Sequence, residues 1–208
     1  MLRQSTRRDA YAAALERLRE LGVLYRCFRT RREVLVAVAG APHRDDPVDT
    51  LAFTPQPLSP EQDAERAARG DPFAWRLSLD RAEAAVGGFE RLTWREGDGV
   101  RVADPRRLGD LVLGRKDIGA GYMIAAVVDD AWQGVTHVIR GEDLAEVTSV
   151  QRVLQALLDL PTPNYRHHSL LLAADGRRLS KRDGAEALVA IRERGVAPEQ
   201  LRAELGFE

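Results

Sequence analysis

A strand–helix–strand pattern over residues 135–181 constrains the fold more than any other feature of this sequence. The apolar run VTHVIRGEDL at 135–144 ends in a charged turn, as a strand of a parallel sheet does at its carboxyl edge. Apolar residues then repeat at helical spacing in SVQRVLQALLDL at 149–160, and Pro161 ends that helix. A second apolar strand follows at 165–172. This βαβ-like unit favours an α/β fold.

Shorter elements surround this unit. Helical spacing predicts further helices, which lie at 5–22, 30–40, within the proline-rich connection 41–72, at 184–194 and at 198–205. Alternation of apolar and polar residues predicts short strands within 23–28, 73–79, 89–96 and 100–104. The segment GYMIAAVVDDAWQG at 121–134 opens either as a helix or as a buried strand.

The composition excludes several classes of protein. No run of about 18 apolar residues is present, so we expect no membrane span. A single cysteine, Cys27, excludes an internal disulfide and fits a reducing cytoplasm. The net charge of −1 provides no global basic field of the kind that marks a simple RNA-binding module. The 31 basic residues include only two lysines, Lys116 and Lys181, and either could mark a site that needs a compact ammonium or be a chance survivor.

Several common catalytic and metal-binding motifs are absent from the sequence. It contains no GxGxxG, no Walker loop, no CxxC, no HExxH and no GxSxG. Cys27 has no partner cysteine for a closed zinc site. His167 and His168 could be ligands, but successive residues of a strand point to opposite faces. We therefore predict no metal site.

A basic loop, RRLSKRDG at 177–184, follows the second apolar strand. Ser180 and Lys181, flanked by Arg178 and Arg182, could form a mobile cationic clamp for a polyphosphate. On composition alone, a solvated basic turn explains the same residues.

The segments on both sides of this loop resemble a known family. YRHHSLLLAADGRRLSKRDGAEAL resembles the strand, turn and KMSKS-type loop of glutamyl-tRNA synthetases. GYMIAAVVDDAWQGVTHVIRGEDL resembles the block in which these class I enzymes hold glutamate and the adenylate. FAWRL and GDLVLGRKD are most similar to the glutamyl-Q tRNA(Asp) synthetases, short paralogues that lack an anticodon-binding domain. The resemblance covers nearly the whole chain.

The resemblance implies a fold and a division of the chain. We expect the C-terminal part of a Rossmann-like class I catalytic domain with a small inserted α+β subdomain like those that bind the tRNA acceptor. The expected parts are the end of the first nucleotide-fold half, the inserted subdomain, the second half with the LSK loop, and the C-terminal helices, at 1–40, 41–107, 108–185 and 186–208. The family's N-terminal segment with its HIGH-type motif has no counterpart here, so we expect impaired activity.

The resemblance also assigns site residues. Lys181 matches the second lysine of the KMSKS-type loop and is the expected catalytic residue, binding ATP phosphates together with Ser180 and Leu179. Tyr122 and Arg140 match the residues that bind glutamate. Taken alone, Tyr122 is better explained as a core aromatic residue with a satisfied hydroxyl.

Arg140 has a structural alternative as well, because it could form an ion pair with Glu142 or Asp143. The resemblance implies that these two acidic residues shape the loop next to the nucleotide. His137 is expected to be a packed strand residue and Lys116 a structural one.

The implied substrates and partners are ATP with Mg²⁺, glutamate and tRNA(Asp), whose anticodon queuosine accepts the glutamate. The zinc-binding Cys-x-Cys of many relatives appears here as Cys27-Phe28-Arg29, and arginine is a permanent cation, so we expect no zinc. We expect a cytoplasmic monomer. Two alternatives are a fragment of a glutamyl-tRNA synthetase that charges tRNA(Glu) and a non-catalytic tRNA-binding remnant.

Overall fold

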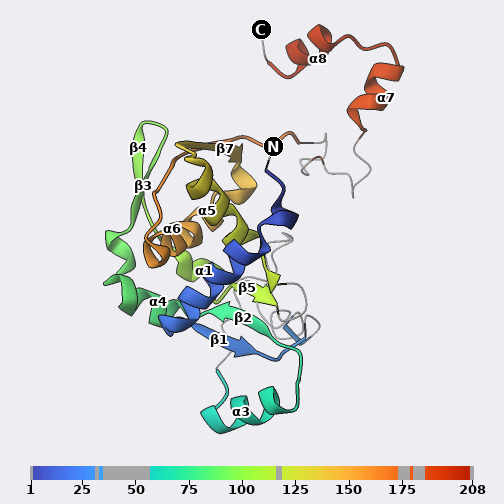
Figure 1. Ribbon diagram of the computed structural model, residues 1–208. Coiled ribbons are helices and arrows are strands. Elements are labelled where there is room, and N and C mark those ends of the chain that lie inside the picture. The colour runs from blue at the N-terminus through green and yellow to red at the C-terminus, as the bar shows by residue number, and fades with distance from the viewer. Residues whose placement is uncertain are drawn as a thin grey trace. The chain divides into compact units, whose positions relative to one another are not determined.

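The chain divides into two compact units, residues 1–167 and residues 168–208. In this computed structural model the described residues are 2–30, 33–34, 57–115, 119–172, 179 and 186–206 (Figure 1). The expected helix over 30–40 lies largely outside them, as does most of the basic loop at 177–184.

The first unit begins with a helix and a strand that the sequence predicts. A short 3-10 helix, η1 (Gln4–Thr6), precedes α1 (Arg8–Glu20), which buries its apolar residues Tyr11 and Leu18. The helix ends before Gly22, whose φ of 71° lies in the left-handed region that favours glycine. Strand β1 (Leu24–Cys27) follows directly. The helix predicted over 5–22 and the strand predicted over 23–28 are confirmed.

Strand β1 is the edge strand of an antiparallel four-stranded sheet with the order β1-β2-β5-β6. Its other strands are β2 (Ala74–Leu77), β5 (Val112–Arg115) and β6 (Gly119–Ala120). Helix α1 packs closely on this sheet at Gly114. A β-carbon there would lie 2.8 Å from Cδ1 of Leu15 and 3.1 Å from the carbonyl oxygen of Gly119.

The second sheet has the order β4-β3-β8-β7. Strands β3 (Thr93–Glu96) and β4 (Gly99–Val102) form a hairpin. Strand β8 (Asn164–His168) runs parallel to β3, with Tyr165 opposite Glu96. The backbone N–H of Gly97 donates to the carbonyl of Tyr165 at 3.1 Å. A hairpin from the middle of the chain is therefore joined to a strand about 70 residues later.

The predicted βαβ unit forms the other half of this sheet. Strand β7 (His137–Gly141), helix α6 (Val147–Leu158) and β8 follow in that order, and β7 and β8 are neighbours. Asn164 N–H donates to the Thr136 carbonyl near the start of both strands, and Arg140 Nε donates to His167 Nε2 near their ends. The first residues of the two strands are neighbours and so are their last residues, so β7 and β8 are parallel. The α/β fold is confirmed.

Helices α1, α5 (Tyr122–Gln133) and α6 form the core of the first unit together with the sheets (Figure 1). The segment 121–134 is thus a helix and not a buried strand. Its buried residues include Ile124 and Val127, which join Val150, Val153 and Leu154 of α6 in one hydrophobic cluster. No helix in the described part of the chain is long and apolar enough to cross a membrane.

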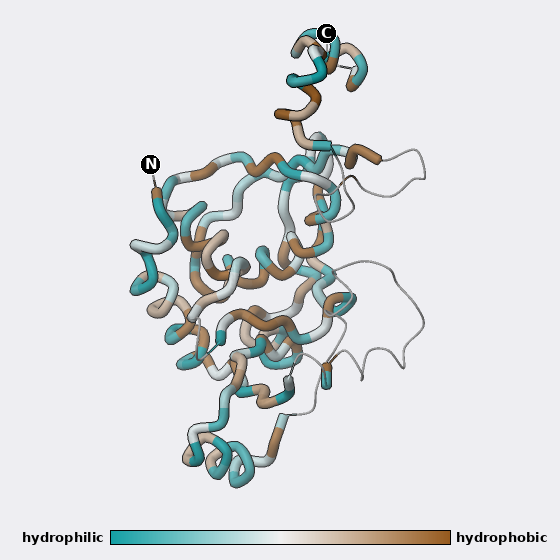
Figure 2. Tube along the Cα trace, turned by 90° about the vertical axis from the view of Figure 1, so that its right-hand side faces the viewer, coloured by the Kyte–Doolittle hydropathy of each residue, from teal (hydrophilic) through white to brown (hydrophobic). Residues whose placement is uncertain are grey.

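Two further short helices belong to the described part of the first unit, and the second of them buries Leu79 and Ala82 in the same hydrophobic cluster. Helix α3 (Pro60–Ala68) has a capping box between Ser59 and Gln62 and buries no residue, as its largely hydrophilic colour in Figure 2 indicates. It is the short helix expected within the proline-rich connection. Helix α4 (Leu79–Val86) was not predicted, although its Ser78 cap and left-handed Gly87 are ordinary helix-boundary signals.

The remaining elements are short. They are the 3-10 helices η3 (Phe89–Arg91), η4 (Pro105–Leu108) and η5 (Glu142–Leu144). The predicted strand at 89–96 therefore begins as η3 and becomes a strand only at β3. In the second unit, α7 (Leu188–Glu193) and α8 (Pro198–Glu204) confirm the two predicted terminal helices.

A buried carboxylate anchors the N-terminal segment to α5. Asp129 accepts hydrogen bonds from Tyr11 Oη at 2.6 Å, Arg7 Nε at 2.6 Å and Gln4 Nε2 at 3.4 Å. Its side chain is only 6% exposed. The Arg7 guanidinium also lies 4.4 Å from the ring centre of Trp132. One acidic side chain thus holds both η1 and α1 in place.

Replacing Asp129 with alanine should therefore destabilise the first unit strongly. Arg7 and Tyr11 would lose their acceptor while still buried, which costs about 3 kcal/mol. Urea unfolding followed by far-ultraviolet circular dichroism measures this loss. Glu16→Ala, which removes only an exposed ion pair with Arg19 on α1, is the matched control and should change little. Equal stability of the two variants would contradict the anchoring role.

Candidate functional site around Arg140

The structure describes three of the five expected site residues. Tyr122 is the first residue of α5, and Arg140 lies next to the carboxyl end of β7, both in the first unit. Leu179 belongs to the second unit, where its N–H donates to the Leu171 carbonyl at 3.0 Å and its side chain is exposed. Lys181 and Ser180 lie outside the described residues, and so does Lys116.

The Arg140 guanidinium is fixed by three neutral acceptors. Nε donates to His167 Nε2 at 3.1 Å, and Nη2 donates to Thr148 Oγ1 at 2.6 Å and to the Leu144 carbonyl at 3.2 Å. The guanidinium also lies 5.3 Å from the ring centre of Tyr165, within the range of a cation–π contact. Its position is thus explained without the alternative ion pair to its neighbours in η5.

Because those acceptors are neutral, they do not cancel the charge of Arg140. The charge of Arg140 does affect the pKa of one carboxyl group, that of Asp130 on α5. Burial raises the pKa of Asp130, the charge of Arg140 lowers it in part, and Asp129 raises it further. The net pKa lies above the usual value. A half-buried guanidinium in this setting is suited to bind an anionic ligand.

His167 is held in turn by a carboxylate from the β3–β4 hairpin. His167 Nδ1 lies 2.6 Å from Glu96 Oε1, and Trp94 Nε1 donates to Glu96 Oε2 at 3.0 Å. The His167 side chain is 4% exposed, and its ring stacks on Tyr165 with centroids 6.2 Å apart and planes at 7°. Sequence reasoning considered His167 only as a metal ligand and missed this role.

His168 lies on the other face of β8, as alternation predicts. It is exposed, and its Nδ1 lies 3.0 Å from the Ser169 carbonyl oxygen. Within the described ranges, no group of three or more His, Cys, Asp or Glu side chains could hold a metal ion.

Tyr165 lies beside Arg140, one of the two expected glutamate ligands, with 5.3 Å between the guanidinium and the ring centre. Burial raises the pKa of Tyr165, the hydrogen bond from Gln155 Nε2 and the charge of Arg140 lower it in part, and Asp130 and Tyr122 raise it. Tyr122 is 55% exposed, so the alternative of a core aromatic residue is wrong.

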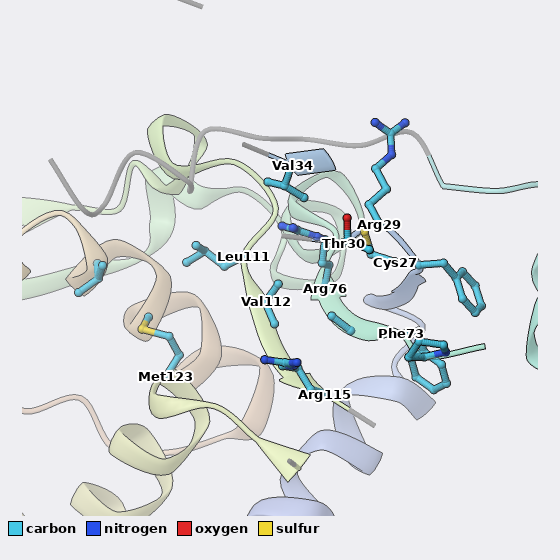
Figure 3. Close-up of a pocket in the computed structure, with 14 residues that line it drawn as sticks. Cys27, Arg29, Thr30, Val34, Phe73, Arg76, Leu111, Val112, Arg115 and Met123 are labelled. Atoms are coloured by element: carbon cyan, nitrogen blue, oxygen red, sulfur yellow. The ribbon is translucent and has the colours of Figure 1, made fainter. Parts of the chain in front are cut away.

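A separate cavity of about 560 Å³ lies between β1, β2, β5 and the start of α5 (Figure 3). Its lining is mainly apolar and includes Phe73 and Met123, the residue after Tyr122. Three arginines also line it: Arg29, Arg76 and Arg115. Such a lining suits a ligand with an apolar part and a negative charge. Sequence reasoning did not find this cavity, because its walls come from distant parts of the chain.

The class of this protein follows from its similarity to a known family. Residues 1–206 match the catalytic domain of the tRNA synthetases class I (E and Q). The chain therefore belongs to the class I aminoacyl-tRNA synthetase family, whose members are ligases, and the resemblance read from the sequence is confirmed.

Individual relatives show which members of this family the chain resembles. The chain is 45% identical over 202 residues to the glutamyl-Q tRNA(Asp) synthetase of Nocardia farcinica, covering 97% of this chain and 61% of that protein. It is 40% identical to the enzyme of the same name from Rhodobacter capsulatus, covering 100% of this chain and 75% of that protein. The glutamate–tRNA synthetase structure from Elizabethkingia anophelis superposes with a TM-score of 0.65 at 25% identity, covering 88% of this chain and 37% of that one.

Glu96 should contribute stability that depends on pH. Burial raises the pKa of Glu96, but the hydrogen bonds from His167 and Trp94 lower it, and the net pKa lies below the ordinary value of 4.5. A carboxyl group whose pKa is lowered by folding stabilises the folded state at pH values above its ordinary pKa. This stabilisation is lost as the pH falls through the lowered pKa.

Glu96→Gln should therefore be less stable at pH 7 and less sensitive to acid. A glutamine oxygen can accept from only one of the two N–H groups, which costs about 1 kcal/mol. Urea unfolding over a series of pH values measures both effects. The same change at the exposed Glu90 is the control and should leave stability at pH 7 unchanged. A variant that keeps the wild-type loss of stability in acid would contradict the assignment.

Proposed function

We propose that the protein containing this chain activates glutamate with ATP and transfers it to queuosine in tRNA(Asp). Support comes from the names of its relatives, which are 45% and 40% identical over nearly all of this chain. The chain spans 61% of the length of the first relative, so the activity of a whole protein is inferred here from part of one.

The observation that carries the proposal is the guanidinium of Arg140, which His167, Thr148 and the Leu144 carbonyl hold in place. Nε and Nη2 of Arg140 are engaged by protein acceptors, and the charge is not cancelled by them. A carboxylate of glutamate can accept from the rest of the guanidinium, and the phenol of Tyr122 can bind a second polar group of the same substrate.

The proposed ATP-binding residues come from the family resemblance alone. Lys181, with Ser180 and Leu179, is proposed to bind ATP phosphates and to stabilise charge on them during activation. Mg²⁺ is proposed to enter with the nucleotide, since it is commonly held by substrate phosphates. We propose no zinc site, because Cys27 is buried against an apolar cavity and Arg29 cannot ligate a cation.

The chemistry follows from these roles. A carboxylate oxygen of glutamate attacks the α-phosphorus of ATP, pyrophosphate leaves, and the enzyme holds the resulting glutamyl-adenylate. An acceptor hydroxyl of the tRNA then attacks the activated carbonyl, and AMP leaves. Positioning and charge stabilisation do most of the catalytic work in such reactions. Arg140 and Tyr122 act by fixing the glutamate at the correct distance and orientation.

Three further parts of the proposal come from the same resemblance. The protein works in the cytoplasm, as a monomer, and its chain is organised as 1–40, 41–107, 108–185 and 186–208. The last three ranges are the inserted subdomain, the second nucleotide-fold half and the C-terminal helices.

A second candidate function is the charging of tRNA(Glu). The observation in its favour is the likeness to solved glutamate–tRNA synthetases, with TM-scores of 0.65 and 0.64 at 25% identity. It shares the activation step with the first proposal and differs only in the acceptor.

Two assays on the protein containing this chain test both candidates. Glutamate-dependent exchange of pyrophosphate into ATP reports activation, and labelled glutamate reports transfer. We expect transfer to tRNA(Asp) that carries queuosine and none to tRNA(Asp) that lacks it. Transfer to tRNA(Glu) instead would favour the second candidate. Binding of tRNA without glutamate-dependent exchange would contradict both and identify a non-catalytic tRNA-binding protein.

Arg140→Lys should raise the KM for glutamate in the exchange assay by a factor on the order of ten or more. A lysine ammonium cannot donate in a fixed planar fork to His167 and Thr148 while also binding a substrate carboxylate. The KM for ATP should change much less. The matched control is Arg166→Lys on the exposed face of β8, which should behave like the wild type. An equal rise in both KM values would contradict a specific role in glutamate binding.

A further inference from the structure

The Arg140 guanidinium is held from one side. Its three hydrogen bonds use Nε and Nη2, and their acceptors lie on β8, η5 and the start of α6. No acceptor for Nη1 is found among the residues that the structure describes, so this nitrogen carries the N–H groups left for a ligand. The orientation of the guanidinium plane decides where Nη1 points, and that orientation depends on the acceptors on the other side.

One of these acceptors works only in a single protonation state. Arginine Nε always carries a proton, so His167 Nε2 must present a lone pair to it at 3.1 Å. His167 is then neutral, with its proton on Nδ1. A proton on Nε2 would place two N–H donors against each other and remove the contact that orients Arg140.

Glu96 selects this state of His167. Its Oε1 lies 2.6 Å from His167 Nδ1, where it can accept the proton that the neutral ring carries on that nitrogen. Trp94 Nε1 holds the other carboxylate oxygen at 3.0 Å. Glu96 itself is fixed by the parallel pairing of β3 with β8, where it stands opposite Tyr165.

We infer that Glu96 and His167 are positioning residues for the proposed substrate-binding Arg140: Glu96 fixes the Nδ1–H tautomer of His167, and His167 Nε2 fixes the guanidinium. This inference rests on the proposed function, because it explains how that site is prepared for glutamate. It adds a carboxylate on the β3–β4 hairpin to a site otherwise built from β7, α5 and α6.

The other groups around His167 are consistent with a neutral ring. Thr148 Oγ1 accepts from Arg140 Nη2, donates to the Leu144 carbonyl at 3.3 Å and lies 3.4 Å from His167 Nε2. The Tyr165 ring stacks on the imidazole. Asp130 on α5, whose pKa is lowered in part by the charge of Arg140, is a further acidic group. The cation of Arg140 itself disfavours a second positive charge on the ring beside it.

Nuclear magnetic resonance of the histidine ring nitrogens tests the first half of the inference without any substrate. The chain has four histidines, and His167→Asn identifies the signal of His167 by its loss. We expect a protonated Nδ1 and an unprotonated Nε2 near neutral pH in the wild type. Glu96→Gln should weaken this preference. A ring protonated on Nε2 in the wild type would overturn the inference.

Two substitutions of His167 test the second half. In His167→Asn the side-chain amide can still donate to Glu96, but it is too short to provide an acceptor at the Nε2 position. In His167→Gln the longer side chain can place its oxygen there. We expect His167→Asn to weaken glutamate binding on the order of tenfold, with little change in ATP binding, and His167→Gln to restore most of it.

His137→Asn is the matched control, because His137 is exposed at the opposite end of β7 and contacts Asn164. It should keep the wild-type affinity for glutamate. Unchanged affinity in His167→Asn, or an equal loss in His167→Gln and His167→Asn, would overturn the positioning role.

Failure of the proposed function can be distinguished from failure of the positioning role of Glu96 and His167. If the wild-type protein binds no glutamate, the proposed function and the role of the pair in it are both overturned. The nitrogen signals would then still report whether Glu96 and His167 hold Arg140 as described.

Discussion

The burial of α6 is the constraint on which the rest of the first unit depends. Ten of its twelve residues are buried, and several of them are polar, so each needs a partner inside the protein. Ser149 accepts from the Asp104 backbone, Gln155 donates to the Tyr165 hydroxyl, and Thr148 accepts from Arg140. These bonds run from one helix to both halves of the second sheet. A helix with an entirely apolar surface could pack in many rotations, whereas these contacts allow only one.

This arrangement explains why the candidate site is assembled from distant parts of the chain. The parallel pairing of β3 with β8 brings Glu96 to His167, 71 residues later. The parallel pairing of β7 with β8 brings Arg140 to the same imidazole. Tyr122 comes from a separate element, at the start of α5. Shifting β8 by one residue would turn His167 to the opposite face of the sheet and separate the members of this cluster.

Much of the fold could be predicted from local patterns, because the strand–helix–strand unit has strong periodicity and clear ends. The family could also be predicted from the segments that flank Arg140. The partners of Arg140 could not, since the register of β3 against β8 leaves no local signal in the sequence. Helix α4 was missed for another reason: its eight residues follow directly on β2, and the alternation of that strand obscured the Ser78 cap. The role of the LSK loop remains a prediction, because Ser180 and Lys181 lie outside the described ranges.

Gly114 has a consequence for how this protein can be altered. A β-carbon there would approach a leucine methyl group, which can rotate away, and a backbone carbonyl oxygen, which cannot do so without moving β6. The obstacle to an alanine is thus the neighbouring strand β6 rather than helix α1. An engineered library or homologous graft across β5 that replaces glycine at position 114 requires β6 to shift by a few tenths of an ångström. The spacing between the backbones of two adjacent strands, rather than the backbone angles of the residue, imposes this restriction.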